Sequence, residues 1–170
     1  MFKFTDEAFL LLKRLEGLEL HVHWDSLAKI WDIGYGHTGP TLSEPGWNLD
    51  ATTKSITEEE AKQLCLQDLA VFTEAVQGTV GKGLPEDSNS LKLSNNQFSA
   101  LVIFVYNIGV TAFEDSKLGQ YLIGNASGTS PDTTYVAGEL RRWNKSRGRV
   151  VQGLINRREA EIKLWETPDV

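Results

Sequence analysis

Three of the four carboxylates in the segment LKRLEGLELHVHWDSLAKIWDIGYGHTG, which covers residues 12–39, stand where a pattern ends or is interrupted. Glu16 ends a helical pattern, where the carbonyl end of the helix repels negative charge and favours an acid that keeps its proton. Asp25 ends an alternating pattern and can start a turn. Asp32 interrupts an apolar strand pattern, in which aspartate is depleted. An acid at a helix end and two more on the hairpin that follows indicate glycoside hydrolysis by paired carboxylates across a cleft.

A helix, a hairpin and a long helix must position these acids. The first helix ends at Glu16, and Gly17 can supply its left-handed C-terminal residue. Residues 18–24 alternate between apolar and polar side chains, which predicts a strand, and residues 29–35 can return as its partner. The sequence TEEE opens a helix over residues 57–78 with a capping box.

The second half of the chain is predicted to be helical. Residues 94–97 cap a helix whose body, FSALVIFVY, is apolar all round, so it is buried but too short to span a bilayer. Further helices are predicted over 116–123, 132–143 and 150–165. We expect a mainly helical α+β fold with a β-hairpin lobe over about 17–56, a linking helix over about 57–78, and a helical lobe over about 90–170 that includes the N-terminal helix.

The composition excludes several classes of function. With 170 residues and 41% hydrophobic content the chain can bury the core of one domain. The net charge of -6 argues against nucleic acid or anionic membrane as a partner. Cys65 is the single cysteine and cannot form an internal disulfide. The apolar patch at residues 9–12 is too short for a signal peptide or an anchor, so we expect no stable membrane association.

Several segments, in this order, resemble the phage-type lysozymes, the endolysin muramidases of tailed phages. EGL at 16–18, DS at 25–26 and IGYGHT at 33–38 resemble the active-site segment of that family. TEEEAKQLCLQD resembles its inter-lobe helix, NNQFSALVIFVYNIG its buried helix, and LRRWNKSRGRVVQGLINRREAEIKLW its C-terminal segment. The resemblance implies a lysozyme-like fold, no cofactor or metal, and hydrolysis of the β-1,4 bond between N-acetylmuramic acid and N-acetylglucosamine in peptidoglycan.

The resemblance also assigns site residues. Glu16 matches the general acid of the family, and Asp25, with eight residues intervening, matches its second carboxylate. The positions that match substrate-contacting residues are Gly36, His37, Tyr106 and Asn107.

Asp32 marks a departure from the family. The family has five residues between its Asp and a Thr that helps to hold the attacking water, whereas here six intervene and Asp32 stands in the place of that Thr. A separation of about 5–5.5 Å between Glu16 and the working carboxylate would imply a retaining route with Asp32 or Asp25 as nucleophile, and about 6.5–9.5 Å would imply inversion. We expect inversion, with Asp32 as base or water holder and Asp25 as electrostatic support.

His37 has an expected structural partner. Asp68 falls in the middle of the apolar face of the 57–78 helix, and a buried aspartate needs a partner. The resemblance places His37 against this Asp, so we predict an ion pair between them rather than a catalytic base or a metal ligand. His21 and His23 share one strand face, but they lack a third metal ligand and are expected to be surface residues.

A basic segment runs from Arg141 to Arg158 and contains no acid. It can be a solvated basic face, or a nucleic-acid-binding surface that lacks a recognisable motif. In a lysozyme, one Arg would pair with Glu16 and the others would meet the lactyl and peptide carboxylates of peptidoglycan. The basic residues of the segment are Arg141, Arg142, Lys145, Arg147, Arg149, Arg157 and Arg158.

The resemblance predicts a monomeric endolysin that degrades the bacterial cell wall and lyses the host for phage release. We expect it to accumulate in the host cytoplasm and to reach the periplasmic wall after a holin-like, membrane-permeabilising protein acts. Two alternatives remain. A lytic transglycosylase also uses a single acid, and a non-catalytic peptidoglycan-binding module would keep the cleft while losing the geometry of the acids.

Overall fold

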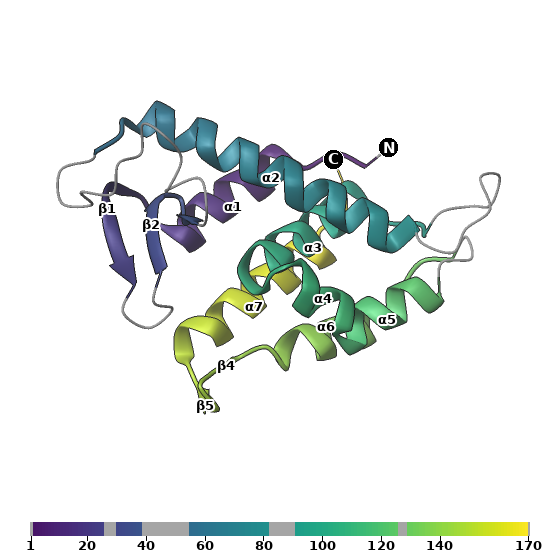
Figure 1. Cartoon of the computed structure of the whole chain (residues 1–170). Coiled ribbons are helices and arrows are strands. Elements are labelled where there is room, and N and C mark those ends of the chain that lie inside the picture. Colours follow the sequence, from purple (N-terminus) through teal and green to yellow (C-terminus); the bar gives the residue numbers. More distant parts are fainter. Residues whose placement is uncertain (1, 26–29, 39–54, 82–90, 126–128, 170) are drawn as a thin grey trace. The chain divides into compact units, whose positions relative to one another are not determined.

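The structure, a computed structural model, describes residues 2–25, 30–38, 55–81, 91–125 and 129–169 (Figure 1). The chain divides into two compact units: a sheet unit, Leu12–Val71, and a helical unit, which combines Met1–Leu11 with Phe72–Val170. Both boundaries fall inside helices, so the predicted division into two lobes and a linking helix stays a prediction. Within the described ranges, no helix has both the length and the apolar character needed to cross a membrane.

The sheet unit contains the last residues of the first helix and a small antiparallel sheet. Helix α1 (Asp6–Glu16) ends where the sequence predicts, and Gly17 follows with a φ of 74° while its N–H donates to the carbonyl of Lys13 at 3.1 Å. Strands β1 (Glu19–Asp25) and β2 (Ile30–Gly34) form the predicted hairpin. A short strand that the sequence did not predict, β3 (His37–Thr38), adds to β2, giving the order β1-β2-β3.

Helix α2 (Glu58–Gly81) starts at the predicted capping box. The hydroxyl of Thr57 accepts from the N–H of Glu60 at 3.2 Å, and the carboxylate of Glu60 accepts from the N–H of Thr57 at 2.7 Å. Strand β2 approaches this helix closely at Gly34, where a Cβ would lie 3.3 Å from the Cβ of Ala61. Gly34 also has a φ of +69°, so both its conformation and its surroundings favour glycine.

The helical unit is built around α3 (Asn95–Ile108), whose residues 98–105 are all buried, as its apolar sequence predicts. Ser94 caps it, and Gln97 completes a second capping box. Helix α7 (Gln152–Glu166) packs against α3, and α6 (Thr133–Arg141) packs against α7. Together with the small sheets, these helices confirm the mainly helical α+β class.

Two short features of the helical unit were missed by the sequence analysis. The segment between α3 and α5 (Lys117–Gly124) forms a separate helix, α4 (Val110–Asp115). Strands β4 (Lys145–Ser146) and β5 (Arg149–Val150) form a two-stranded hairpin just before α7. One or two turns of helix and two-residue strands contain too few residues to show a periodic pattern, which is why they were not predicted.

The first turn of α3 is the meeting point of two segments that are distant in sequence. The N–H of Lys3 donates to the side-chain oxygen of Asn95 at 2.9 Å. The carboxylate of Asp169 accepts from the backbone N–H groups of Asn95 at 2.7 Å and Asn96 at 2.9 Å. Desolvation opposes the charged form of Asp169, but these N–H donors hold its pKa below the ordinary value. Lys3 and Asp169, which lie near opposite ends of the sequence, thus both hydrogen-bond to the first turn of α3.

Candidate active site

Glu16, the predicted general acid, is the last residue of α1 and is half-buried. The chain turns at Gly17 and enters β1 two residues later, so the acid is fixed between a helix end and the sheet. Asp25, the predicted second carboxylate, is the last residue of β1 and lies in backbone register with Ile30 of β2. The catalytic roles of both acids stay predictions.

Asp32 lies on β2 directly opposite His23 of β1. The imidazole Nδ1 of His23 is 3.3 Å from one carboxylate oxygen of Asp32 and 3.5 Å from the other. The side chain of Asp32 is only 22% exposed, and a polar partner offsets part of the cost of placing an aspartate there. His23 is exposed, as the sequence predicts, but its contact with Asp32 was not predicted; pairing the two strands so that Asp25 lies opposite Ile30 would have indicated it.

His37 and Asp68 make the predicted contact. The Nδ1 atom of His37 lies 2.8 Å from a carboxylate oxygen of Asp68 on α2. His37 is 4% exposed, because it follows the turn through Gly36 and points into the sheet unit between β3 and α2. This burial favours the structural interpretation, whereas contact of Gly36 and His37 with substrate stays a prediction.

A second polar cluster connects α1, the turn after β2 and α2 within the sheet unit. The Nζ atom of Lys13 lies 3.2 Å from the carboxylate of Glu58 and 5.1 Å from the ring centre of Tyr35. The hydroxyl of Tyr35 donates to the same carboxylate oxygen at 3.2 Å. The hydrogen bond from Lys13, followed by that from Tyr35, lowers the pKa of Glu58. This cluster fixes the helix that carries Glu16 to its neighbours.

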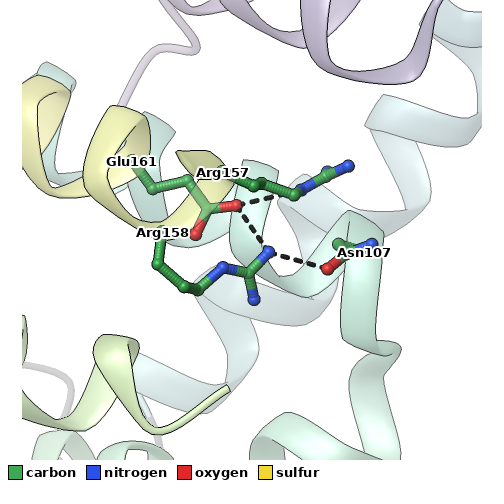
Figure 2. Close-up of polar contacts among 4 residues, drawn as sticks. All are labelled: Asn107, Arg157, Arg158 and Glu161. Carbon is green, nitrogen blue, oxygen red and sulfur yellow. Dashed lines mark hydrogen bonds and ion pairs between the residues drawn. The ribbon is translucent and has the colours of Figure 1, made fainter. Parts of the chain in front are cut away.

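The predicted substrate-contacting residues of α3 lie in the helical unit. The ring of Tyr106 is half-buried and packs against that of Phe72, with 5.0 Å between ring centres. Asn107 is exposed, and its side-chain oxygen accepts from Nη2 of Arg158 at 2.7 Å (Figure 2). Since a guanidinium can only donate, the side-chain oxygen of Asn107 faces Arg158 and its NH₂ group points elsewhere.

Arg157 and Arg158 are buried, so this part of the basic segment is not a solvated face. Arg158 is 1% exposed, and its guanidinium lies 4.9 Å from the ring centre of Phe104. Glu161 is 0% exposed and accepts from Nε of Arg157 at 3.2 Å and from Nη2 of Arg158 at 2.9 Å (Figure 2). These three charges form a buried cluster on α7, because residues three and four apart share one helix face.

The other basic residues of the segment remain at the surface. Arg141 forms a two-point ion pair with Glu159, at 2.7 Å and 2.9 Å, which lowers the pKa of Glu159. Nε of Arg142 lies 3.1 Å from a carboxylate oxygen of Glu139. The exposed cations on and beside the β4–β5 hairpin are Lys145, Arg147 and Arg149.

Comparison with known proteins identifies the family. A family model described as phage lysozyme matches residues 13–161. The chain belongs to the phage lysozyme family. It is 36% identical to an endolysin of Bacillus phage PZA over 92% of this chain and 52% of that protein. It is 32% identical to an endolysin of Acyrthosiphon pisum secondary endosymbiont phage 1 over 96% of this chain and 97% of that protein.

This chain spans about half the length of the first two curated relatives, which are both Bacillus phage endolysins. Among solved structures, the muramidase domain of SpmX from Asticaccaulis excentricus aligns with a TM-score of 0.76 and 30% identity over 99% of this chain and 100% of that one. A P22 lysozyme mutant aligns with a TM-score of 0.73 and 27% identity over 98% and 100%. These neighbours confirm the lysozyme-like fold.

The His37–Asp68 pair is expected to contribute to the stability of this chain. Asp68→Asn should lower the free energy of unfolding by about 1–2 kcal/mol, because a charge-assisted hydrogen bond to a buried group is replaced by a neutral one. A thermal melt followed by circular dichroism should show the loss. Glu74→Gln changes an exposed carboxylate on the same helix and is the matched control. Equal melting temperatures for Asp68→Asn and wild type would contradict a stabilising pair.

Proposed function

We propose that this chain is a muramidase-type endolysin that hydrolyses the β-1,4 bond between N-acetylmuramic acid and N-acetylglucosamine in peptidoglycan. The observation that carries the proposal is the placement of an acid, Glu16, at the end of α1 and of a second, Asp32, on the sheet that follows. Support comes from the family, from relatives named endolysins and from a structural neighbour described as a muramidase domain.

The proposed reaction inverts the configuration of the sugar. Glu16 donates its proton to the leaving glycosidic oxygen, and the carboxylate of Asp32 accepts a proton from the water that attacks the opposite face of the sugar ring. Asp25 supports the positive charge that develops on the ring. Glu16 is half-buried and is the last residue of α1, directly before the turn into the sheet.

Substrate contacts are proposed on both units. In the helical unit, the side-chain oxygen of Asn107 accepts from Arg158, so its NH₂ group is the proposed donor to the glycan, and the ring of Tyr106 is the proposed aromatic contact. In the sheet unit, the turn at Gly36 is the proposed contact. The exposed cations Lys145, Arg147 and Arg149 suit the lactyl and peptide carboxylates of peptidoglycan.

Asp32 variants and the first-formed product test the mechanism together. Asp32→Asn should lose most activity, because the amide cannot take the proton from water, and Asp32→Thr should recover part of it by holding the water. NMR of soluble peptidoglycan chains during turnover should show the α-anomer first.

Other outcomes assign the chemistry differently. A first-formed β-anomer would overturn inversion and leave Asp32 or Asp25 as nucleophile. Anhydromuramic ends, detected by mass spectrometry, would identify a lytic transglycosylase instead, and wild-type protein that binds peptidoglycan without cleaving it would identify a binding module. Equal activity of Asp32→Asn and wild type would remove Asp32 from the mechanism.

The proposal includes the place of action. We expect a monomer that accumulates in the host cytoplasm and reaches the wall once a holin-like protein has permeabilised the membrane. Ala8 and Leu12 of α1 are fully buried, so one side of this helix packs into the fold. Expression in a Gram-negative host should leave cells growing, and chloroform should then cause rapid loss of turbidity. Lysis without membrane damage would contradict this route.

A further inference from the structure

The cross-strand contact between His23 and Asp32 has a defined geometry. The two residues are directly opposite in the antiparallel ladder, so their side chains leave the same face of the sheet. The next pair in the ladder, Trp24 and Trp31, packs ring against ring at 5.0 Å, and side chains alternate between faces along a strand. The tryptophan pair therefore lies on one face of the sheet and the His23–Asp32 pair on the other.

The contact fixes where the proton of the imidazole lies. An ionised carboxylate can only accept hydrogen bonds, so the Nδ1 atom that faces Asp32 must carry a hydrogen. Nε2 is then the acceptor of the neutral ring. The side chain of His23 is 57% exposed and that of Asp32 is 22% exposed. Solvent therefore reaches both side chains while His23 contacts the carboxylate of Asp32.

We propose that His23 is a positioning residue for Asp32, which the mechanism above uses as base. This inference rests on the proposed function. The Nδ1–H group holds the ionised carboxylate so that a remaining lone pair faces the attacking water. In the reaction, one proton passes from water to Asp32 while the water oxygen forms a bond to the anomeric carbon. The glycosidic bond breaks, and its electron pair goes to the leaving oxygen, which takes the proton of Glu16.

Variants of His23 separate positioning from proton transfer. His23→Leu removes the donor, and kcat on soluble peptidoglycan chains should fall by about 10- to 100-fold through loss of orientation, with KM within about twofold. His23→Asn keeps an N–H donor at the position of Nδ1 but cannot take up a proton, so it should stay within about threefold of wild type. His21→Leu, on the same strand, is the control for replacing an exposed histidine.

A double substitution tests whether His23 acts through Asp32. In an Asp32→Thr background, His23→Leu should have no further effect on kcat, because the group that it positions is gone. A long-range ¹H–¹⁵N NMR spectrum should show the neutral His23 ring protonated at Nδ1 in wild type, and Asp32→Thr should abolish that preference.

Specific results would overturn the inference. His23→Asn as inactive as His23→Leu would mean that the imidazole itself takes the proton. Wild-type kcat for His23→Leu, or an Nε2-protonated ring in the wild-type protein, would mean that the contact has no role in positioning. A Glu16→Gln variant, assayed alongside, separates these failures from failure of the proposed function: if it is inactive while His23→Leu is fully active, only the inference about His23 falls.

Discussion

Glu16→Gln is expected to reduce the rate of peptidoglycan cleavage by about 100- to 10,000-fold, the range that general acid catalysis supplies. The amide has the shape of the carboxyl group but cannot give a proton to the leaving oxygen. Because Gln and Glu are nearly equal in size, the substitution changes little of the packing of this half-buried side chain at the end of α1. Release of reducing ends from purified peptidoglycan measures the effect.

The control for this prediction is Glu19→Gln, which makes the same chemical change at an exposed position on β1. It should leave activity at the wild-type level. Thermal melting of both variants should resemble that of wild type, which shows that the loss is chemical. If Glu16→Gln keeps activity within about tenfold of wild type, Glu16 is not the general acid.

Glu161→Gln is expected to cause the largest loss of stability. Glu161 is fully buried and accepts from both Arg157 and Arg158, so its neutral form would leave two buried guanidinium groups without this counter-charge. Removing one partner of a buried ion pair costs about 3–5 kcal/mol. For a chain of this length we expect a melting temperature lower by about 10 °C, measured by calorimetry.

The matched control lies on the same helix. Glu159 also pairs with an arginine, Arg141, but its side chain is 48% exposed. Exposed pairs contribute about 0–1 kcal/mol, so Glu159→Gln should shift the melting temperature by a few degrees at most. Similar small shifts for both variants would mean that the buried cluster adds no more stability than a surface pair.

The elements that the sequence predicted correctly are those with short-range signals. Gly17 ends α1, Thr57 opens the capping box of α2, and Ser94 opens that of α3, because a cap satisfies backbone groups within its own turn. The need of Asp68 for a polar partner could be predicted as well, since this carboxylate falls on an apolar helix face, and the family resemblance supplied His37 as that partner.

Two features of the side chains that were not predicted depend on how separate elements pair. The opposition of His23 and Asp32 is set by the register of the hairpin, and a shift of one residue would move every side chain to the other face. Burial of Arg158 depends on the packing of α7 against α3, although the spacing of Arg157 and Arg158 from Glu161 was a local signal for a charge cluster.

The division of the chain has a consequence for its synthesis. The sheet unit, Leu12–Val71, is an insertion within the helical unit, which needs residues 1–11 together with everything from residue 72 onward. The chain leaves the ribosome N-terminus first, so the inserted sheet unit can fold before the helical unit is complete. The first eleven residues can make their contacts with α3 only after α3 has been synthesised, and the hydrogen bonds from the first turn of α3 to Asp169 form last. An interrupted chain would therefore carry Glu16, His23 and Asp32 on a unit whose helical counterpart is still incomplete.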